Sequence, residues 1–166
     1  WLDSPLLPHS LYSRYLLELV DLVDRRYRTV TSRAGRGLCG FSMGGYGAML
    51  LACQHPAKFE AASSLLGPLD VVQLFPDHYR LRLLLGSKLA TWQRYNPTSL
   101  AASLAHTALK FCTAEEAFDR SQNDAFATAL QSLNIPFEYN IYPGGHDTIF
   151  VREHIAAHLV FHQRRM

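Results

Sequence analysis

Cys39-Gly40-Phe41-Ser42-Met43-Gly44-Gly45 is the stretch that decides the fold, and it contains the pattern G-x-S-x-G. Before it, residues 36–41 form a short apolar run bounded by glycine, which is typical of a buried strand. After it, residues 43–55 are rich in helix-forming side chains and stop at Pro56. The sequence therefore predicts a strand that turns directly into a helix at Ser42.

A turn this sharp forces the serine into a strained backbone conformation, and neighbours without a Cβ atom relieve the crowding around it. The hydroxyl is lifted above the sheet, with the positive end of the helix dipole beneath it. A Gly-Ser-Gly cluster by itself is equally typical of a loop. The strand before Ser42 and the helix after it favour a nucleophile elbow instead.

Length and composition restrict the class of protein. The 166 residues are 48% hydrophobic and 18% charged, which predicts one globular domain over residues 1–166. The net charge of +2, without a basic run, argues against nucleic-acid binding, and no apolar stretch reaches the roughly 18 residues of a membrane helix. Cys39, Cys53 and Cys112 each lie in an apolar segment, so we expect buried free thiols. This slightly favours a cytoplasmic location without deciding it.

Hydrophobic periodicity divides the chain into alternating helices and strands. Residues 69–106 show no long element, only short helical pieces and bulky side chains. Strands that alternate with helices predict a mostly parallel sheet with right-handed crossovers, and therefore an α/β fold. We expect helices over residues 11–27, 43–55, 121–133 and from the 143–147 loop to about 163, with strands over residues 36–41, 61–66, 108–112 and 137–142.

Polar groups follow three of these strands. In parallel sheets, reactive groups gather beyond the carboxyl ends of the strands. Ser42 ends the first predicted strand, Glu115 and Glu116 follow the third, and His146 follows the fourth. We therefore expect these places to converge, and the order serine, acid, histidine is that of the α/β-hydrolase triad.

His146 is the candidate general base. A serine hydroxyl needs an adjacent base to take its proton, and His146 is the one histidine of eight that lies at a strand end, between glycines and a helix start. The alternative is a loop histidine that only caps the helix. His154, His158 and His162 recur every four residues, but no acidic or cysteine partner for a metal is evident, and a helix face explains them better. We expect no metal and no organic cofactor.

The acid of the triad has three candidates, which we rank Glu116, Glu115 and Asp119. All three follow the third strand within reach of a triad histidine, and the alternative is that most of them are exposed surface acids. Asp147 is adjacent to His146 and is better explained as the N-cap of the last helix.

The oxyanion of a tetrahedral intermediate also needs hydrogen-bond donors. The backbone N–H of Met43, directly after the serine, is the expected first donor. The second normally comes from a loop after an earlier strand, and this sequence contains no such strand. For the substrate pocket, we expect a contribution from Phe75, His78, Tyr79 and Trp92, although a purely structural aromatic cluster is a close alternative.

The chain resembles the esterase family that includes S-formylglutathione hydrolase (esterase D), tributyrin, feruloyl and acetyl-xylan esterases and the mycolyltransferases. The resemblance implies Ser42 as nucleophile and His146 as base, with short-chain acyl esters or thioesters as substrates. A typical Gly-Thr-Glu-Asp-like segment of the family corresponds here to residues 113–116, so the family's aspartate aligns best with Glu116. The matching stretches are residues 1–5 (WLDSP), 39–51 (CGFSMGGYGAMLL), 55–59 (HPAKF), 66–70 (LGPLD), 142–147 (YPGGHD) and 152–154 (REH).

Members of this family carry several further strands before the point where this chain begins. The resemblance therefore implies that only the C-terminal, four-stranded part of an α/β-hydrolase fold is present, without the second oxyanion donor. The strand over residues 36–41 then becomes an edge, which we expect to pair with a second copy or with an N-terminal segment. The alternative to an esterase is a catalytically silent remnant that serves as an assembly or binding module.

Overall fold

The computed structural model describes residues 1–166 and contains one four-stranded sheet in the order β1-β2-β3-β4. Each neighbouring pair of strands is parallel. The sheet confirms the predicted α/β class, and all four strands occur where the sequence places them, with β3 two residues longer than expected. The strands are β1 (Gly37–Phe41), β2 (Ala61–Leu65), β3 (Ala108–Ala114) and β4 (Glu138–Tyr142).

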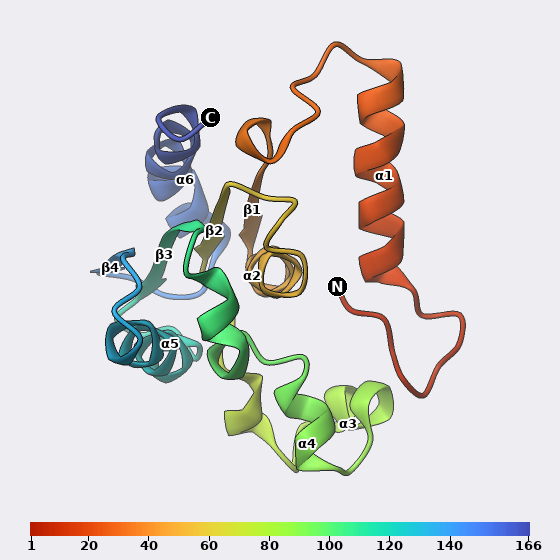
Figure 1. The fold of residues 1–166 in the computed structure, drawn as a ribbon. Helices are drawn as coiled ribbons and strands as arrows, with labels where there is room; N and C mark the ends of the chain where they lie inside the picture. Colours follow the sequence, from red (N-terminus) through yellow and green to blue (C-terminus); the bar gives the residue numbers. More distant parts are fainter.

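Helices cover both faces of this sheet. Figure 1 shows α2 and α5 against one face and α6 against the other, with the short helices α3 and α4 beyond one end of the sheet. None of the helices combines the length and the apolar character that crossing a membrane requires. The helices are α1 (Tyr12–Arg26), α2 (Met43–Gln54), α3 (Tyr79–Leu85), α4 (Leu89–Gln93), α5 (Arg120–Ser132) and α6 (Thr148–Gln163), with 3₁₀ turns η1 (Arg33–Gly35), η2 (Val71–Leu74) and η3 (Thr98–Leu104).

The core lies on both sides of the central strands. Between the sheet and α2 and α5, the side chains of Met49, Phe111 and Phe126 are completely buried, and the ring of Phe111 stacks on that of Tyr139. On the α6 face, Phe150 packs in a second cluster with residues of β2 and β3. Burial on both faces is typical of strands in a parallel sheet covered by crossover helices, and it fixes the strand ends that carry the candidate site.

β1 is an edge strand, as predicted, because it hydrogen-bonds only to β2. One of the three cysteine predictions is wrong: Cys53 and Cys112 are buried, but Cys39 in β1 is exposed. The physical reason is that β1 has a neighbouring strand on one side only. An edge of this kind presents unpaired N–H and C=O groups and invites pairing with another strand.

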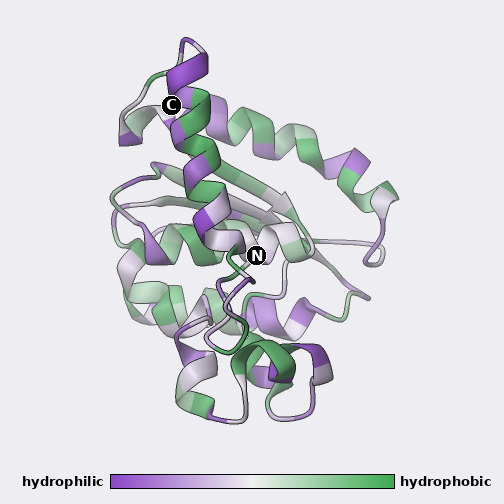
Figure 2. Cartoon of the chain, turned by 90° about the vertical axis from the view of Figure 1, so that its right-hand side faces the viewer, coloured by the Kyte–Doolittle hydropathy of each residue, from purple (hydrophilic) through white to green (hydrophobic).

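Helix α1 lies beyond this edge strand, well separated from the other helices (Figure 1). Only Ser13 of α1 is buried. Figure 2 turns this side toward the viewer and shows hydrophobic and hydrophilic segments alternating along the helix. The helix is therefore amphipathic, but five of its apolar side chains are between 36% and 58% exposed: Tyr12, Tyr15, Leu19, Leu22 and Val23.

Candidate active site

Ser42 lies at the junction of β1 and α2, between the last residue of the strand and the first of the helix. Its backbone has φ 53° and ψ −121°, a left-handed conformation that a residue with a Cβ atom adopts only when its surroundings impose it. The Ser42 N–H donates to the carbonyl oxygen of Leu65 in β2 at 2.9 Å. The strand, the helix and this hydrogen bond together hold the serine in the sharp turn predicted from residues 39–45.

The glycines around Ser42 have different roles. A Cβ atom on Gly40 would lie 2.1 Å from the carbonyl oxygen of Gly44, and one on Gly45 would lie 2.4 Å from the hydroxyl of Ser64. The backbone oxygen beside Gly40 cannot move aside, whereas at Gly45 the buried Ser64 hydroxyl would have to shift, with Gly40 O and Gly67 Cα also only 3.1 Å and 3.2 Å away. A Cβ atom on Gly44 would meet nothing within 4 Å. The close approach of the strand to the helix therefore requires glycine at 40 and 45, whereas the turn leaves room at 44.

His146 lies in the loop between β4 and α6, and its imidazole reaches Ser42. The distance from His146 Nε2 to Ser42 Oγ is 2.8 Å, although the two residues are 104 positions apart in the chain. The loop contains Gly144 with φ 119°, and it ends at Asp147, whose side chain accepts the N–H of Phe150 at 2.9 Å. Asp147 is thus the N-cap of α6, which confirms its predicted role and leaves its neighbour His146 to face the serine.

Asp119 is the carboxylate that contacts this histidine. Its Oδ1 lies 2.8 Å from His146 Nδ1, and its side chain is completely buried. Its Oδ2 accepts hydrogen bonds from the hydroxyl of Thr113 at 2.8 Å and from the amide of Asn123 at 2.9 Å. Both oxygens of the buried carboxylate are therefore satisfied, as burial of a charged group requires.

The structure corrects the predicted order of the acids. Glu116 and Glu115, ranked first and second, have exposed side chains, and it is Asp119, ranked third, that is brought to the imidazole. The reason lies in the backbone: the N–H of Glu115 donates to Tyr142 O and that of Glu116 to Gly144 O. These bonds tie the end of β3 to the loop that carries His146 and turn both glutamate side chains outward.

Two supporting residues were not anticipated from the sequence. Thr113 is in β3, and Asn123 is in the first turn of α5, where its amide also donates to the backbone oxygens of Gly67 and Asp119. Asn123 follows Asp119 by four residues, which places the two on one face of a helix. The spacing of four residues could have indicated Asn123 as a partner of Asp119, but only if Asp119 had first been chosen as the acid.

Two aromatic rings also pack against the imidazole of His146. The Phe118 ring centroid is 4.5 Å from that of the imidazole, and the Phe41 centroid is 5.4 Å from it. The planes are inclined by 33° and 35° respectively. The imidazole therefore has polar partners at both nitrogens and aromatic neighbours at its ring.

Met43, the expected oxyanion donor, is the first residue of α2, so its N–H has no acceptor within the helix. This position next to Ser42 agrees with the geometry that the proposed role needs. The role itself stays a prediction.

Of the four residues expected at a substrate pocket, two pack against each other and two are exposed. Trp92 is completely buried, its indole N–H donates to Gly86 O at 2.8 Å, and its ring packs edge-on against Phe75. His78 accepts the N–H of Leu81 at the start of α3. Tyr79 is 72% exposed. Phe75 and Trp92 therefore have the contacts of a structural aromatic pair, and a role for the four residues at a substrate pocket stays a prediction.

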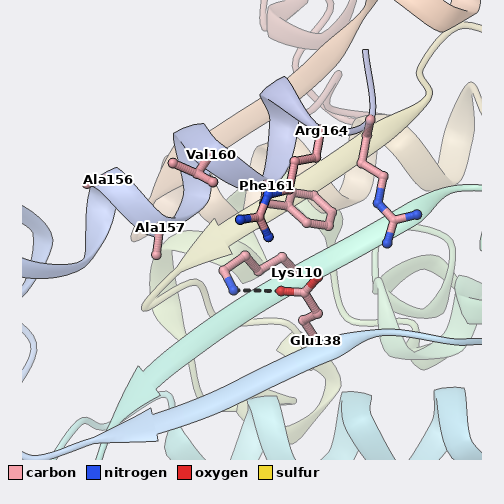
Figure 3. Close-up of a pocket in the computed structure, with 8 residues that line it drawn as sticks. Lys110, Glu138, Ala156, Ala157, Val160, Phe161 and Arg164 are labelled. Carbon is pink, nitrogen blue, oxygen red and sulfur yellow. Dashed lines mark hydrogen bonds and ion pairs between the residues drawn. The ribbon is translucent and has the colours of Figure 1, made fainter.

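A surface cavity lies away from Ser42 and His146. It has a volume of about 590 Å³ and lies between α6 and strands β3 and β4, where Lys110 donates to Glu138 at 2.8 Å (Figure 3). The small side chains of Ala156 and Ala157 border it from α6. None of its lining residues belongs to the Ser42, His146 and Asp119 group, so this cavity is separate from the candidate active site.

The three histidines spaced along α6 face the sheet. His158 Nε2 lies 3.3 Å from the sulfur of Cys112, and His162 Nε2 lies 2.8 Å from the hydroxyl of Ser63. The ring of His154 stacks on that of Tyr142 at 3.9 Å. Burial lowers the pKa of His158 to about 3 and also lowers that of His162. Packed histidines of this kind, two of them with a lowered pKa, fit the helix-face interpretation.

Comparison with known proteins agrees with this geometry. Residues 9–160 match the model of a family described as putative esterase. The chain is 24% identical over 169 residues to S-formylglutathione hydrolase of Paracoccus denitrificans, covering 99% of this chain and 60% of that protein. The chain thus spans less than two thirds of the length of this relative.

Solved structures likewise match nearly all of this chain but only about two thirds of their own length or less. An S-formylglutathione hydrolase from Agrobacterium tumefaciens superposes with a TM-score of 0.85 at 25% identity, over 99% of this chain and 62% of that one. FphF, a fluorophosphonate-binding serine hydrolase of Staphylococcus aureus, superposes with a TM-score of 0.83 at 22% identity, over 98% and 66% of the two chains. The fold is therefore that of part of an α/β hydrolase. The family match extends over nearly all of the sequence, including the elbow and the histidine loop, and the chain belongs to the putative esterase family.

Proposed function

We propose that this chain carries the catalytic machinery of a serine esterase that hydrolyses short-chain acyl esters or thioesters. The observation that supports this most directly is the continuous line of hydrogen bonds from Ser42 Oγ through His146 to Asp119, with 2.8 Å at each step. A nucleophile, a base and a group that orients the base are the parts that acyl transfer to serine requires.

The hydrogen-bond partners determine the tautomer of His146. Asp119 receives hydrogen bonds from Thr113 and Asn123 and acts as an acceptor, so the proton of the neutral imidazole lies on Nδ1, facing Asp119. Nε2 then has a free lone pair that accepts the hydroxyl of Ser42. This is the tautomer that a general base needs.

The reaction follows from this arrangement. Ser42 Oγ attacks the acyl carbonyl carbon while its proton moves to His146 Nε2, and the imidazolium is stabilised by Asp119. The N–H of Met43 donates to the oxyanion. The intermediate collapses as the bond to the alcohol or thiol breaks, and that leaving group takes the proton from Nε2. Water then attacks the acyl-enzyme with His146 again acting as base, which releases the acid and restores Ser42.

The choice of substrate rests on the relatives. A relative and a solved structure are both named S-formylglutathione hydrolase, which supports a small thioester or ester as the substrate of this chain. No step of the proposed mechanism requires a metal or an organic cofactor. The oxygen ester and the thioester would use the same residues, so the site favours neither.

The sheet edge adds a proposal about assembly. β1 has no strand on its outer side and α1 exposes five of its apolar side chains, while the chain spans about 60% of the relative's length. We propose that β1 pairs with a second copy or with a further segment that supplies strands. Because removal of one oxyanion donor costs about 10²–10³ in rate, activity would depend on whether such a partner provides one.

Labelling with a fluorophosphonate probe tests the esterase proposal. We expect the folded protein to be labelled at Ser42 and the label to disappear in Ser42→Ala. Ser87→Ala, which removes an exposed serine elsewhere, is the matched control and should label like the wild type. A folded wild-type protein that does not react would contradict the proposal and favour a catalytically silent assembly module.

A further inference from the structure

The aromatic ring of Phe118 lies against the imidazole of His146, with centroids 4.5 Å apart and planes inclined by 33°. The ring of Phe41 approaches the same imidazole at 5.4 Å with a 35° inclination. Nδ1 and Nε2 at the imidazole edge are occupied by Asp119 and Ser42. Centroid distances and angles in this range correspond to tilted, offset contact between ring surfaces, which an imidazole engaged at both nitrogens still has available.

Hydrophobic burial does not explain the position of Phe118. Its side chain is 65% exposed, although it lies between Ala117 and Asp119, which are 7% and 0% exposed. The backbone fixes this segment as a turn, because the N–H of Ala117 donates to Ala114 O and the N–H of Arg120 donates to Ala117 O. The turn that directs Asp119 inward therefore presents the ring of Phe118 to the imidazole and to solvent.

We propose that Phe118, together with Phe41, is a positioning residue for His146, and that its ring also stabilises the imidazolium formed when Ser42 gives up its proton. The inference rests on the proposed esterase function. The face of an aromatic ring is negative and attracts a cation within about 6 Å of the centroid, a condition that the 4.5 Å separation meets. The neutral imidazole of the resting enzyme gains less from this attraction, so the contact favours the transition state.

The effect should be modest because the ring is exposed to water. Cation–π contacts at exposed sites correspond to about a twofold to fivefold effect on rate. Phe118→Leu keeps an apolar side chain and removes the aromatic face, so we expect kcat to fall by about this factor with little change in KM. Phe118→Tyr keeps the face and should restore the rate. Because the side chain is mostly exposed, both variants should fold.

A fluorination series separates electrostatic stabilisation from simple packing. Phenylalanine analogues with one, two and three ring fluorines at position 118 keep the ring shape but progressively reduce the negative charge of its face. With p-nitrophenyl acetate as substrate, we expect kcat to fall at each added fluorine. Tyr27→Leu, which removes another exposed aromatic ring outside the site, should leave kcat unchanged. A flat fluorination series together with wild-type kcat in Phe118→Leu would overturn the proposal.

An NMR measurement keeps this test separate from that of the esterase proposal. A ring next to the imidazole displaces the resonance of the His146 Cε1 proton, and this displacement should be lost in Phe118→Leu and retained in Phe118→Tyr. If the displacement is present but the wild type does not react with a fluorophosphonate, the contact is supported and the esterase proposal fails. If the wild type reacts but neither kcat nor the resonance responds at position 118, this inference alone is refuted.

Discussion

His146 Nδ1 lies 2.8 Å from Oδ1 of Asp119, and this carboxylate is completely buried. Asp119 is the residue directly before α5, yet its carboxylate does not cap that helix. One carboxylate oxygen instead contacts the histidine, and the other accepts hydrogen bonds from Thr113 and Asn123. The contact joins the segment after β3 to the loop after β4, so the orientation of the imidazole depends on how these two segments pack.

The first prediction compares the acids. Asp119→Asn should reduce kcat/KM for p-nitrophenyl acetate by about 10³–10⁴, because an amide no longer selects the imidazole tautomer that accepts the serine proton. Glu116→Gln should have little effect, since its side chain is exposed and the two imidazole nitrogens contact Asp119 and Ser42 instead. A larger loss in Glu116→Gln than in Asp119→Asn would restore the acid ranked first from the sequence.

The second prediction concerns the donors behind Asp119. Thr113→Val keeps the side-chain shape but removes the hydroxyl that donates to Asp119 Oδ2. The free energy of unfolding should decrease by about 1–3 kcal/mol, because a buried carboxylate loses a hydrogen bond. Urea denaturation followed by circular dichroism measures this. Thr128→Val, where the hydroxyl donates to Asp124 O at an exposed position, is the control and should change stability much less.

The third prediction separates the glycines of the elbow. Gly40→Ala should strongly destabilise or unfold the protein, because its Cβ atom would lie 2.1 Å from a backbone oxygen that cannot move aside. Gly44→Ala should fold with nearly wild-type stability, since nothing lies within 4 Å of its Cβ position. Thermal unfolding of both variants decides the matter. An equal loss of stability in the two variants would contradict the prediction that position 40 is crowded and position 44 is not.

The fourth prediction concerns acid stability. Burial lowers the pKa of His158 in the folded state to about 3, below the ordinary value of 6.5. Above pH 6.5 the imidazole of His158 is neutral in the folded and in the unfolded chain, so it causes no loss of stability there. Between pH 6.5 and 3 the unfolded chain binds a proton that the folded chain does not, and the free energy of unfolding should fall by about 1.4 kcal/mol per pH unit.

His162 contributes with the same sign, because burial also lowers its pKa. The groups that face His158 are Cys112 and Lys110 on β3 and its helix neighbours His154 and His162, all of which disfavour or do not assist protonation. Urea unfolding at intervals from pH 7 to pH 4 should show the slope, and His158→Gln should reduce it. His9→Gln, at an exposed position, should not, and an unchanged slope in His158→Gln would refute the assignment.

The sequence alone was enough to predict the main helices and strands, and to select Ser42 and His146 as candidate site residues. The elbow follows from residues 39–45 because local sterics decide where a strand can turn into a helix, and the structure has that turn. The Asp147 cap is likewise a local interaction within one turn of helix. The succession of strand and helix segments was enough to predict the parallel sheet, because parallel strands of one sheet are joined by right-handed crossovers.

Only the tertiary structure decided which acid faces His146. Three carboxylates within five residues were candidates, with Glu116 ranked first, and the choice depends on backbone hydrogen bonds from Glu115 and Glu116 to the loop after β4. The exposure of Cys39 and the requirement for Gly45 were decided in the same way, by which strand has a neighbour and by the approach of the Ser64 side chain. Local steric preferences act within a few residues and can be read along the chain, whereas contacts between distant segments exist only once the sheet has brought their ends together.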